Sequence, residues 1–397
     1  MDEVCSLDDF ELDRRCFNLS ASMSACFSWT YGWLGGRLVA PIDPNKFDNA
    51  SSKIAEIGVR LLIVLGAVAS VIFAGTYILL GAVVLSAGSK IFRSLGYYFQ
   101  KNRMTHMRGS AAEQPLQQGH AKIMEWNIRG HGGGLHYSKG GVVHWSSRLP
   151  GIVEAVLKEE PDVIVLQEVY DTRLVEALYA HLEPFYAHFY AHLGANVWGE
   201  ESGIMVIAKC AIHRFFHTDF TQTEDQVQRS FETLEIKASP DASAPCARIL
   251  STQLSPGRNA SELRMDQISQ ILDTLAKEKL TLPTLLVGSL NVDRDNTEES
   301  AYLARYFSHS YLDSEPTHSE ELKNQWAPIF EGQEESNSYI SLAKRTPEGD
   351  VRTFPVRERG VRLGDSHLIR GFNKEYDTAT ATSDHHAVVT ELSGLTS

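Results

Sequence analysis

The sequence has few cysteines, and none are spaced for a zinc site or a disulfide framework. The 397 residues include five cysteines, with no CxxC pair among them. An odd number in a chain of this size argues against a disulfide-stabilised secreted domain. We therefore expect free thiols in a reducing compartment. For the three cysteines that precede the hydrophobic segment described below, acylation near a membrane surface is the alternative.

The chain also lacks an excess of positive charge and a cleavable signal. Its formal net charge is −13, which argues against a protein that coats nucleic acid through a strong positive field. It does not exclude an enzyme that acts on phosphodiesters, because a bound divalent cation can supply positive charge locally. The first residues, MDEVCSLDDFELDRR, are acidic and have no charged-then-apolar signal pattern.

One long hydrophobic run is present, and it predicts a membrane segment. Residues 61–89 contain no charged side chain, and a single helix of this length would extend about 43 Å. Because the hydrocarbon core is only about 30 Å thick, we expect a tilted span, a hairpin that turns near Gly75, or a buried soluble helix. The basic residues that follow, between 90 and 103, favour a cytosolic location for the C-terminal domain at a membrane.

The chain divides into four parts by composition. We expect an N-terminal cytosolic or interfacial segment (1–57), a transmembrane or membrane-inserted segment (58–92), a basic juxtamembrane region with linker (93–120) and a large domain (121–394). In the last part, buried or alternating strands outnumber amphipathic helices, which indicates an α/β or α+β layered domain. The clearest strands are AKIMEWNI, PDVIVLQEV, GIMVIAK, FETLEIKA, CARILSTQL, TLLVGSLNV and DHHAVVTEL.

Polar side chains recur at the ends of these apolar strands. Asn127, Glu168 and Asn291 each follow a strand, whereas Asp384 and His385 precede the last one. A buried carboxylate is costly unless it is paired or binds a metal. Each of these residues alone is weak evidence, but together they indicate a site at one rim of the sheets.

The motifs WN, PDVIVLQEV, GSLN and SDHH occur in this order over residues 121–394 and resemble the endonuclease/exonuclease/phosphatase superfamily. The resemblance implies a four-layer α/β/β/α sandwich of two mixed sheets. The segments QEVYDTRLVEAL, SGIMVIAKCAI and ELRMDQISQIL are similar to the neutral sphingomyelinase branch. That similarity implies a membrane-attached, Mg²⁺-dependent phosphodiesterase acting on a membrane lipid, sphingomyelin or a related phosphodiester. We do not expect nucleic acid as a partner.

The resemblance also implies roles for individual residues. Glu168 would bind Mg²⁺ with the help of Asn127, in keeping with the oxygen ligands that Mg²⁺ prefers. Asn291 would bind a phosphate oxygen. His385, oriented by Asp384, would stabilise the phosphoryl group or act in acid–base catalysis. Arg229 stands where the sphingomyelinases have a lysine, so we expect it to contact substrate.

Two positions depart from the family pattern. The family has an Asp in its GDxN motif, where this chain has Ser289, and a His after the central strand, where it has Gln253. Neither side chain can act as a general base, and losing one such group costs about 10²–10⁴-fold in rate. Asp293 should lie about 13 Å beyond Ser289 along an extended strand, too far to replace the Asp. The sequence thus leaves two interpretations: an enzyme with an altered water-activating set, or a degenerate pseudoenzyme that binds lipid, metal or protein.

Overall fold

The computed structural model describes residues 84, 87–88, 91, 105–130, 145–194, 201–221, 228–257, 260–278, 282–292, 297–309, 338–344, 361–364, 366–369, 383 and 386–395. Within these ranges, no helix combines the length and the apolar character needed to cross a membrane. The predicted membrane segment, 58–92, lies outside the described residues apart from four positions. It therefore stays a prediction.

The first sheet is mixed, with strand order β1-β4-β5-β3-β2-β14-β12 and with β13 paired to β14. Its central strands, β2 and β3, run parallel, and β14 runs antiparallel to β2. The strands are β1 (Thr105–Arg108), β2 (Ala121–Asn127), β3 (Val163–Gln167), β4 (His188–Ala191), β5 (Met205–Ala208), β12 (Arg362–Leu363), β13 (His367–Ile369) and β14 (Ala387–Ser393).

The second sheet has the order β10-β11-β9-β8-β7-β6. It is mixed as well, because β8 and β9 run parallel while the other neighbours are antiparallel. Its strands are β6 (Ile212–Asp219), β7 (Ser230–Ile236), β8 (Ala247–Gln253), β9 (Thr284–Ser289), β10 (Phe307–His309) and β11 (Ser338–Ala343).

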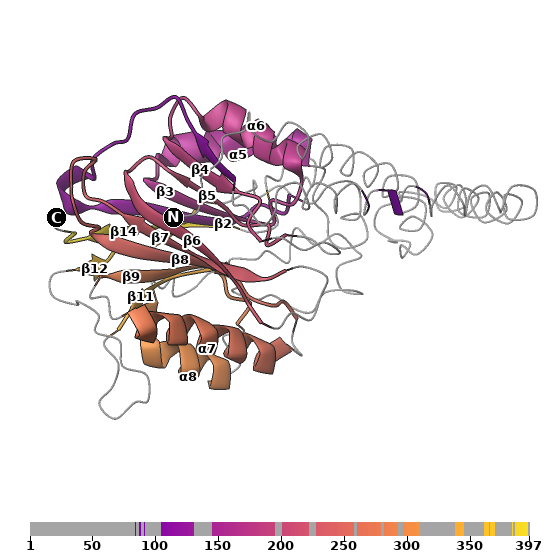
Figure 1. The fold of residues 1–397 in the computed structure, drawn as a ribbon, viewed down its shortest axis with the longest axis vertical. Coiled ribbons are helices and arrows are strands. Elements are labelled where there is room, and N and C mark those ends of the chain that lie inside the picture. Colours follow the sequence, from indigo (N-terminus) through magenta and orange to yellow (C-terminus); the bar gives the residue numbers. More distant parts are fainter. Residues whose placement is uncertain are drawn as a thin grey trace, which may run out of the picture.

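Helices cover the outer faces of both sheets (Figure 1). α5 (Trp145–Glu159) and α6 (Thr172–Leu182) lie over the first sheet, and α7 (Ser261–Glu278) and α8 (Thr297–Tyr306) lie over the second. A short 3₁₀ helix, η4 (Gln117–Gly119), precedes β2. Three apolar cores follow from this layering: one under α5 and α6, one between the sheets, and one under α7 and α8. The described residues therefore form the predicted α/β/β/α layers.

Alternation along β2 shows how one strand serves two cores. Met124 and Trp126 pack under the helices, whereas Ile123 packs between the sheets. Because side chains alternate between the faces of a strand, the residues two and four positions after Ile123 also face the second sheet. Those residues are Glu125 and Asn127, and both are buried.

Residues 105–120, which we expected to be a linker, are part of the folded domain. β1 pairs antiparallel with β4, so that Thr105 lies opposite Ala191. Further along, Gln114 forms a bridge to Cys210, and the Leu116 amide donates to the Ala238 carbonyl at 2.9 Å. Besides these backbone hydrogen bonds, the segment buries Met107 and Leu116, and two apolar side chains this far apart give no hydrophobic period in the sequence. The boundary that we placed at 121 is therefore too late.

Candidate active site

The strand ends that the sequence indicated lie together at the same end of the two facing sheets. Asn127 lies opposite Gln167 on the parallel pair β2 and β3, and Gln253 lies opposite Ser289 on the parallel pair β8 and β9. β14 begins at the same edge because it runs antiparallel to β2. Just before it, the Ser383 hydroxyl donates to the Asn127 carbonyl at 2.7 Å.

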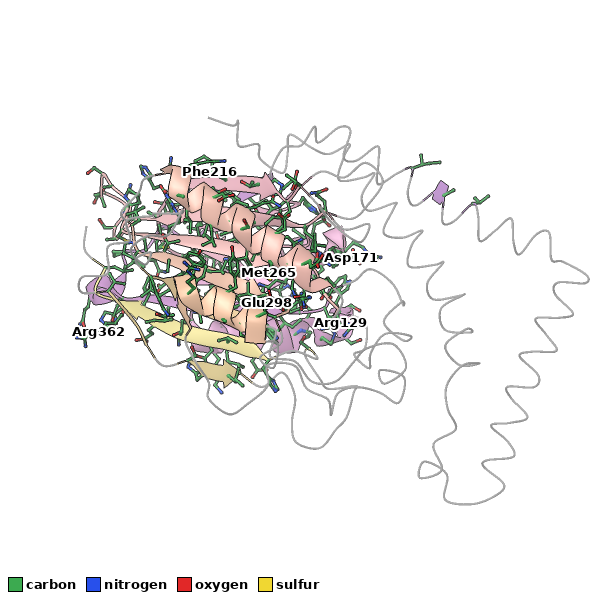
Figure 2. All side chains as sticks on the ribbon, turned by 90° about the horizontal axis from the view of Figure 1, so that it is seen from below. Arg129, Asp171, Phe216, Met265, Glu298 and Arg362 are labelled. Atoms are coloured by element: carbon green, nitrogen blue, oxygen red, sulfur yellow. The ribbon has the colours of Figure 1, made fainter. Side chains whose placement is uncertain are left out.

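Figure 2 shows the same end of the domain from another direction. Arg129 and Asp171, which follow the ends of β2 and β3, lie together at one end, whereas Arg362 lies at the opposite end. Arg362 pairs with Ser393, the last residue of β14. The candidate site thus lies at the end of the domain where β2 and β3 finish and β14 starts.

Glu168 is held by amides from both sheets. Asn127 Nδ2 of the first sheet donates to Glu168 Oε1 at 2.7 Å, and Gln253 Nε2 of the second sheet donates to the same oxygen at 3.2 Å. The Glu168 backbone is left-handed, with φ 59°, and its carbonyl accepts from the Gly130 amide at 2.7 Å. Such a conformation costs roughly 1–2 kcal/mol for a residue with a Cβ. It persists where surrounding contacts fix it, which is common at functional sites.

Among these residues, Glu168 could supply the protein carboxylate of an open magnesium site. Mg²⁺ usually takes one or two protein carboxylates and completes its shell with waters and substrate phosphate. Glu168 supplies one such carboxylate, and the described part of the chain has no group of three or more His, Cys, Asp or Glu side chains that could enclose a metal. The Asn127 amide oxygen accepts from the Arg129 amide at 3.0 Å. Asn127 therefore orients the carboxylate, and its role as a direct ligand stays a prediction.

Asn291 is fixed just beyond the end of β9. Its Nδ2 donates to the Leu254 carbonyl at 2.7 Å, and the Leu254 amide donates to the Ser289 carbonyl at 3.0 Å. Its backbone is left-handed too, with φ 52°. These contacts lock the amide between the ends of β8 and β9, where a phosphate oxygen would have to bind for the predicted role.

Ser289 faces the first sheet, where it meets a buried carboxylate. Its Oγ lies 3.5 Å from Glu125 Oε1, at the outer limit of a hydrogen bond. Glu125 has no exposed surface. Glu125 was not among the predicted site residues, although a charged residue inside an apolar strand, in phase with Asn127, was a signal that could have found it.

The loop after Gln253 is held by α7, the helix that contains the sphingomyelinase-like segment ELRMDQISQIL. Arg264 Nη1 donates to the carbonyls of Ser255 and Gly257 at 3.0 and 2.6 Å, and Arg264 also forms a buried ion pair with Glu299 of α8 at 3.0 Å. Gln267 exchanges hydrogen bonds with Ser255. The two side chains of α7 therefore support the end of β8 from beneath.

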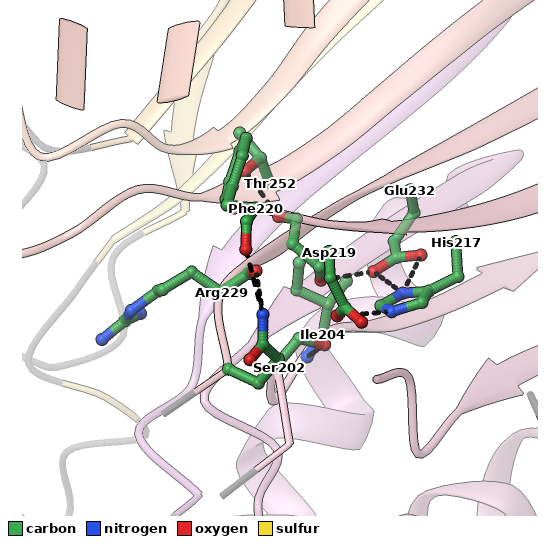
Figure 3. A network of polar contacts seen from close by, with 10 residues as sticks. Ser202, Ile204, His217, Asp219, Phe220, Arg229, Glu232 and Thr252 are labelled. Carbon is green, nitrogen blue, oxygen red and sulfur yellow. Dashed lines mark hydrogen bonds and ion pairs between the residues drawn. The ribbon is translucent and has the colours of Figure 1, made fainter. Parts of the chain in front are cut away.

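Of the three remaining predicted residues, Asp384, His385 and Arg229, the structure describes Arg229. Asp384 and His385 are outside the described ranges, as is Asp293. Arg229 is buried at the start of β7, and its carbonyl accepts from the Phe220 amide at 2.9 Å. Figure 3 shows its guanidinium pointing away from the neighbouring His217 cluster. The roles given to Asp384, His385 and Arg229 stay predictions.

The His217 cluster is a second feature that the sequence analysis missed. His217 Nδ1 lies 3.0 Å from both carboxylate oxygens of Glu232, and Nε2 lies 2.8 Å from Asp219 Oδ1 (Figure 3). The Ser230 hydroxyl donates to Glu232 at 2.8 Å. Burial alone would lower the pKa of His217. The charge of Glu232 and the hydrogen bonds to Asp219 and Glu232 outweigh burial and raise that pKa to about 10.

This cluster predicts a specific dependence of stability on pH. Because the folded pKa is raised, the stabilisation is complete below the unfolded pKa of about 6.5 and is lost as pH rises through about 10. We expect Glu232→Gln to reduce the free energy of unfolding by about 2 kcal/mol at pH 6, and the difference from the wild type to shrink towards pH 10.5. Urea unfolding at several pH values measures this. A difference that stays constant from pH 6 to pH 10.5 would contradict it, and Asp219→Asn, at a more exposed partner, should have the smaller effect.

The comparisons with known proteins agree with the fold. The sequence model of the Endonuclease/Exonuclease/phosphatase family matches residues 124–363. No curated protein matches the chain significantly. A beta toxin from Staphylococcus aureus with bound magnesium ions is similar in structure, with a TM-score of 0.53, 16% identity and coverage of 68% of this chain and 98% of the toxin.

Two further solved structures have related folds. TDP2 from D. rerio, complexed with a single-strand DNA product, has a TM-score of 0.50 and 16% identity, covering 69% of this chain and 98% of that one. SmcL has a TM-score of 0.53 and 18% identity, covering 70% of this chain and 100% of that one. At such identities, the likenesses describe the fold and leave the substrate open.

Proposed function

Because the chain belongs to the endonuclease/exonuclease/phosphatase family, whose sequence model matches residues 124–363, we propose that it is a Mg²⁺-dependent phosphodiesterase. We further propose that it acts at a membrane on a phospholipid head group of the sphingomyelin type. The observation that carries the proposal is the Glu168 carboxylate, which amides from two different sheets hold at the shared strand edge.

Each residue would have a defined task in this reaction. Glu168 would hold Mg²⁺, with Asn127 keeping the carboxylate in place. A bound Mg²⁺ supplies Lewis-acid polarisation of a phosphoryl oxygen. Asn291 would contact a second phosphate oxygen, and His385 with Asp384 would handle protons near the leaving group. Gln253 cannot carry a proton, and its hydrogen bond to Glu168 gives it a positioning role instead.

The choice of a lipid substrate rests on the sequence rather than on the site. The uncharged run at 61–89 favours attachment to a membrane, and the net charge of −13 disfavours strong binding to a nucleic acid backbone. The Tyr-Asp pair of the sphingomyelinase-like segment has a local structural role. Tyr170 packs against Gly203, and Asp171 caps α6 while accepting from Trp145 Nε1 at 3.0 Å. That pair supports the strand-to-helix turn and carries no substrate information.

A binding protein without turnover is the second candidate. Gln253 donates a hydrogen bond to one oxygen of Glu168, the proposed metal-binding carboxylate. Ser289 stands where the family has an Asp. A protein of this kind would keep the pocket and bind Mg²⁺ or lipid but release no product.

One assay separates the candidates. Full-length protein in mild detergent would be incubated with sphingomyelin in mixed micelles, or with single-stranded DNA, in the presence of Mg²⁺ or of EDTA. We expect Mg²⁺-dependent release of the lipid head group, with DNA left intact. DNA cleavage without lipid hydrolysis would overturn the lipid assignment. A silent wild type that still binds Mg²⁺ or the sphingomyelin micelles would identify the second candidate.

A further inference from the structure

We propose that Glu125 provides the buried carboxylate at the floor of this site, acting from β2 through the hydroxyl of Ser289 on β9. The carboxylate would then stand on the first sheet, opposite Ser289, and not at position 289 on the second sheet, where the GDxN pattern that GSLN resembles has its Asp. The inference rests on the proposed function and deepens it, because it explains how the site works with a serine at position 289.

The positions of the two residues support this pairing. Glu125 faces the second sheet, in phase with Ile123 and Asn127, and Ser289 faces the first sheet, in phase with Val287. Ser289 Oγ and Glu125 Oε1 are 3.5 Å apart across the interior. The next residue on the Glu125 face is Asn127, which donates to Glu168. Glu125 therefore lies about 7 Å along the strand from the position that holds the metal-binding carboxylate.

Burial makes a merely structural role for Glu125 hard to justify. On β3 it lies opposite Val165, a member of the apolar core between the sheets. Even a well-bonded buried carboxylate is usually no more stabilising than an apolar residue of similar size, and often less so. The fold would be served as well by an apolar residue at position 125. A carboxylate at position 125 is explained if it acts in the proposed reaction, because the proposed catalytic residues lie next to it.

The identity of residue 289 depends on Glu125. An Asp at 289 would place a second carboxylate beside Glu125 in a buried space, where like charges repel strongly. A serine avoids this repulsion and can donate its proton to Glu125. With the proton directed that way, the hydroxyl oxygen can accept a hydrogen bond from a water at the phosphodiester. Glu125 is thus a positioning residue that orients Ser289.

A double-mutant cycle tests the pairing of Glu125 with Ser289 in the full-length protein. The variants are Glu125→Ser, Ser289→Asp and the combined Glu125→Ser/Ser289→Asp, with kcat, KM and the free energy of unfolding measured for each. We expect each single variant to lose about 10–100-fold in kcat with little change in KM, which is at or below the lower end of the range for a group that itself transfers a proton. We expect Ser289→Asp to be the less stable single variant, and the double variant to regain at least about 10-fold in kcat over Ser289→Asp.

The controls keep the outcomes distinct. Glu235→Gln removes another buried carboxylate, one that bonds Arg214 and Arg248, and should lower stability while leaving kcat unchanged. Additive effects across the cycle, in both kcat and stability, would overturn the proposal. If the wild type hydrolyses no phosphodiester, the proposed function fails, yet the unfolding free energies still decide the pairing: non-additivity upholds it and additivity overturns it.

Discussion

Replacing Glu168 with alanine is expected to lower kcat/KM for the Mg²⁺-dependent reaction by at least about 1,000-fold, equivalent to about 4 kcal/mol of transition-state stabilisation. Glu168 is the carboxylate on which the Asn127 and Gln253 amides converge. Removing it takes away the anionic ligand at the strand edge and leaves both amides without that acceptor. Initial rates at saturating and at limiting Mg²⁺ would measure the loss.

Two further variants show whether the loss of activity comes from the missing charge of Glu168 or from a folding defect. Glu168→Gln keeps the shape and an oxygen acceptor for both amides but removes the charge, so it should fold normally and be nearly as inactive. Glu160→Ala is the matched control, because Glu160 is exposed and has the same left-handed backbone, with φ 50°. It should keep full activity. A Glu168→Gln variant with more than about one-tenth of wild-type activity would show that the carboxylate is not the metal ligand.

The strands and their ends could be predicted from the sequence because both carry a local signal. Apolar runs such as VIVL and TLLV mark buried strands, and the polar residue that follows each run marks where the strand ends. Parallel neighbours then bring those ends to one edge, as the pairing of Asn127 with Gln167 shows. Glu168 was found on these grounds, together with the resemblance to the family motifs.

The contacts between the sheets could not be predicted in the same way. Gln253 looked like a lost histidine, but in the structure it donates to Glu168 from the opposite sheet. Glu125 looked like part of a strand, but it faces Ser289. Both contacts depend on how two sheets pack face to face, and no spacing along the chain encodes that distance. The edge strand β1 was missed for a related reason, since backbone pairing with β4 holds it.

The largest expected effect on stability comes from Gly288→Ala. Gly288 has φ 145°, and an added Cβ would lie 1.8 Å from the Thr252 carbonyl oxygen on β8. Thr252 is its partner in the parallel pairing, so the clash is with backbone and no side-chain rotation relieves it. We expect a loss of at least about 4 kcal/mol in the free energy of unfolding, measured by urea denaturation.

A second glycine separates the clash from the backbone conformation. Gly257 also has a positive φ, 91°, but an added Cβ there meets nothing within 4 Å. Gly257→Ala should therefore cost only the conformational penalty, about 1–2 kcal/mol. If the two variants were equally destabilised, contact between β8 and β9 would not be what requires glycine. If Gly288→Ala folds at low temperature, its hydrolysis should still be impaired, because Ser289 and Asn291 follow directly and moving β9 away from β8 displaces both from the edge that holds Glu168.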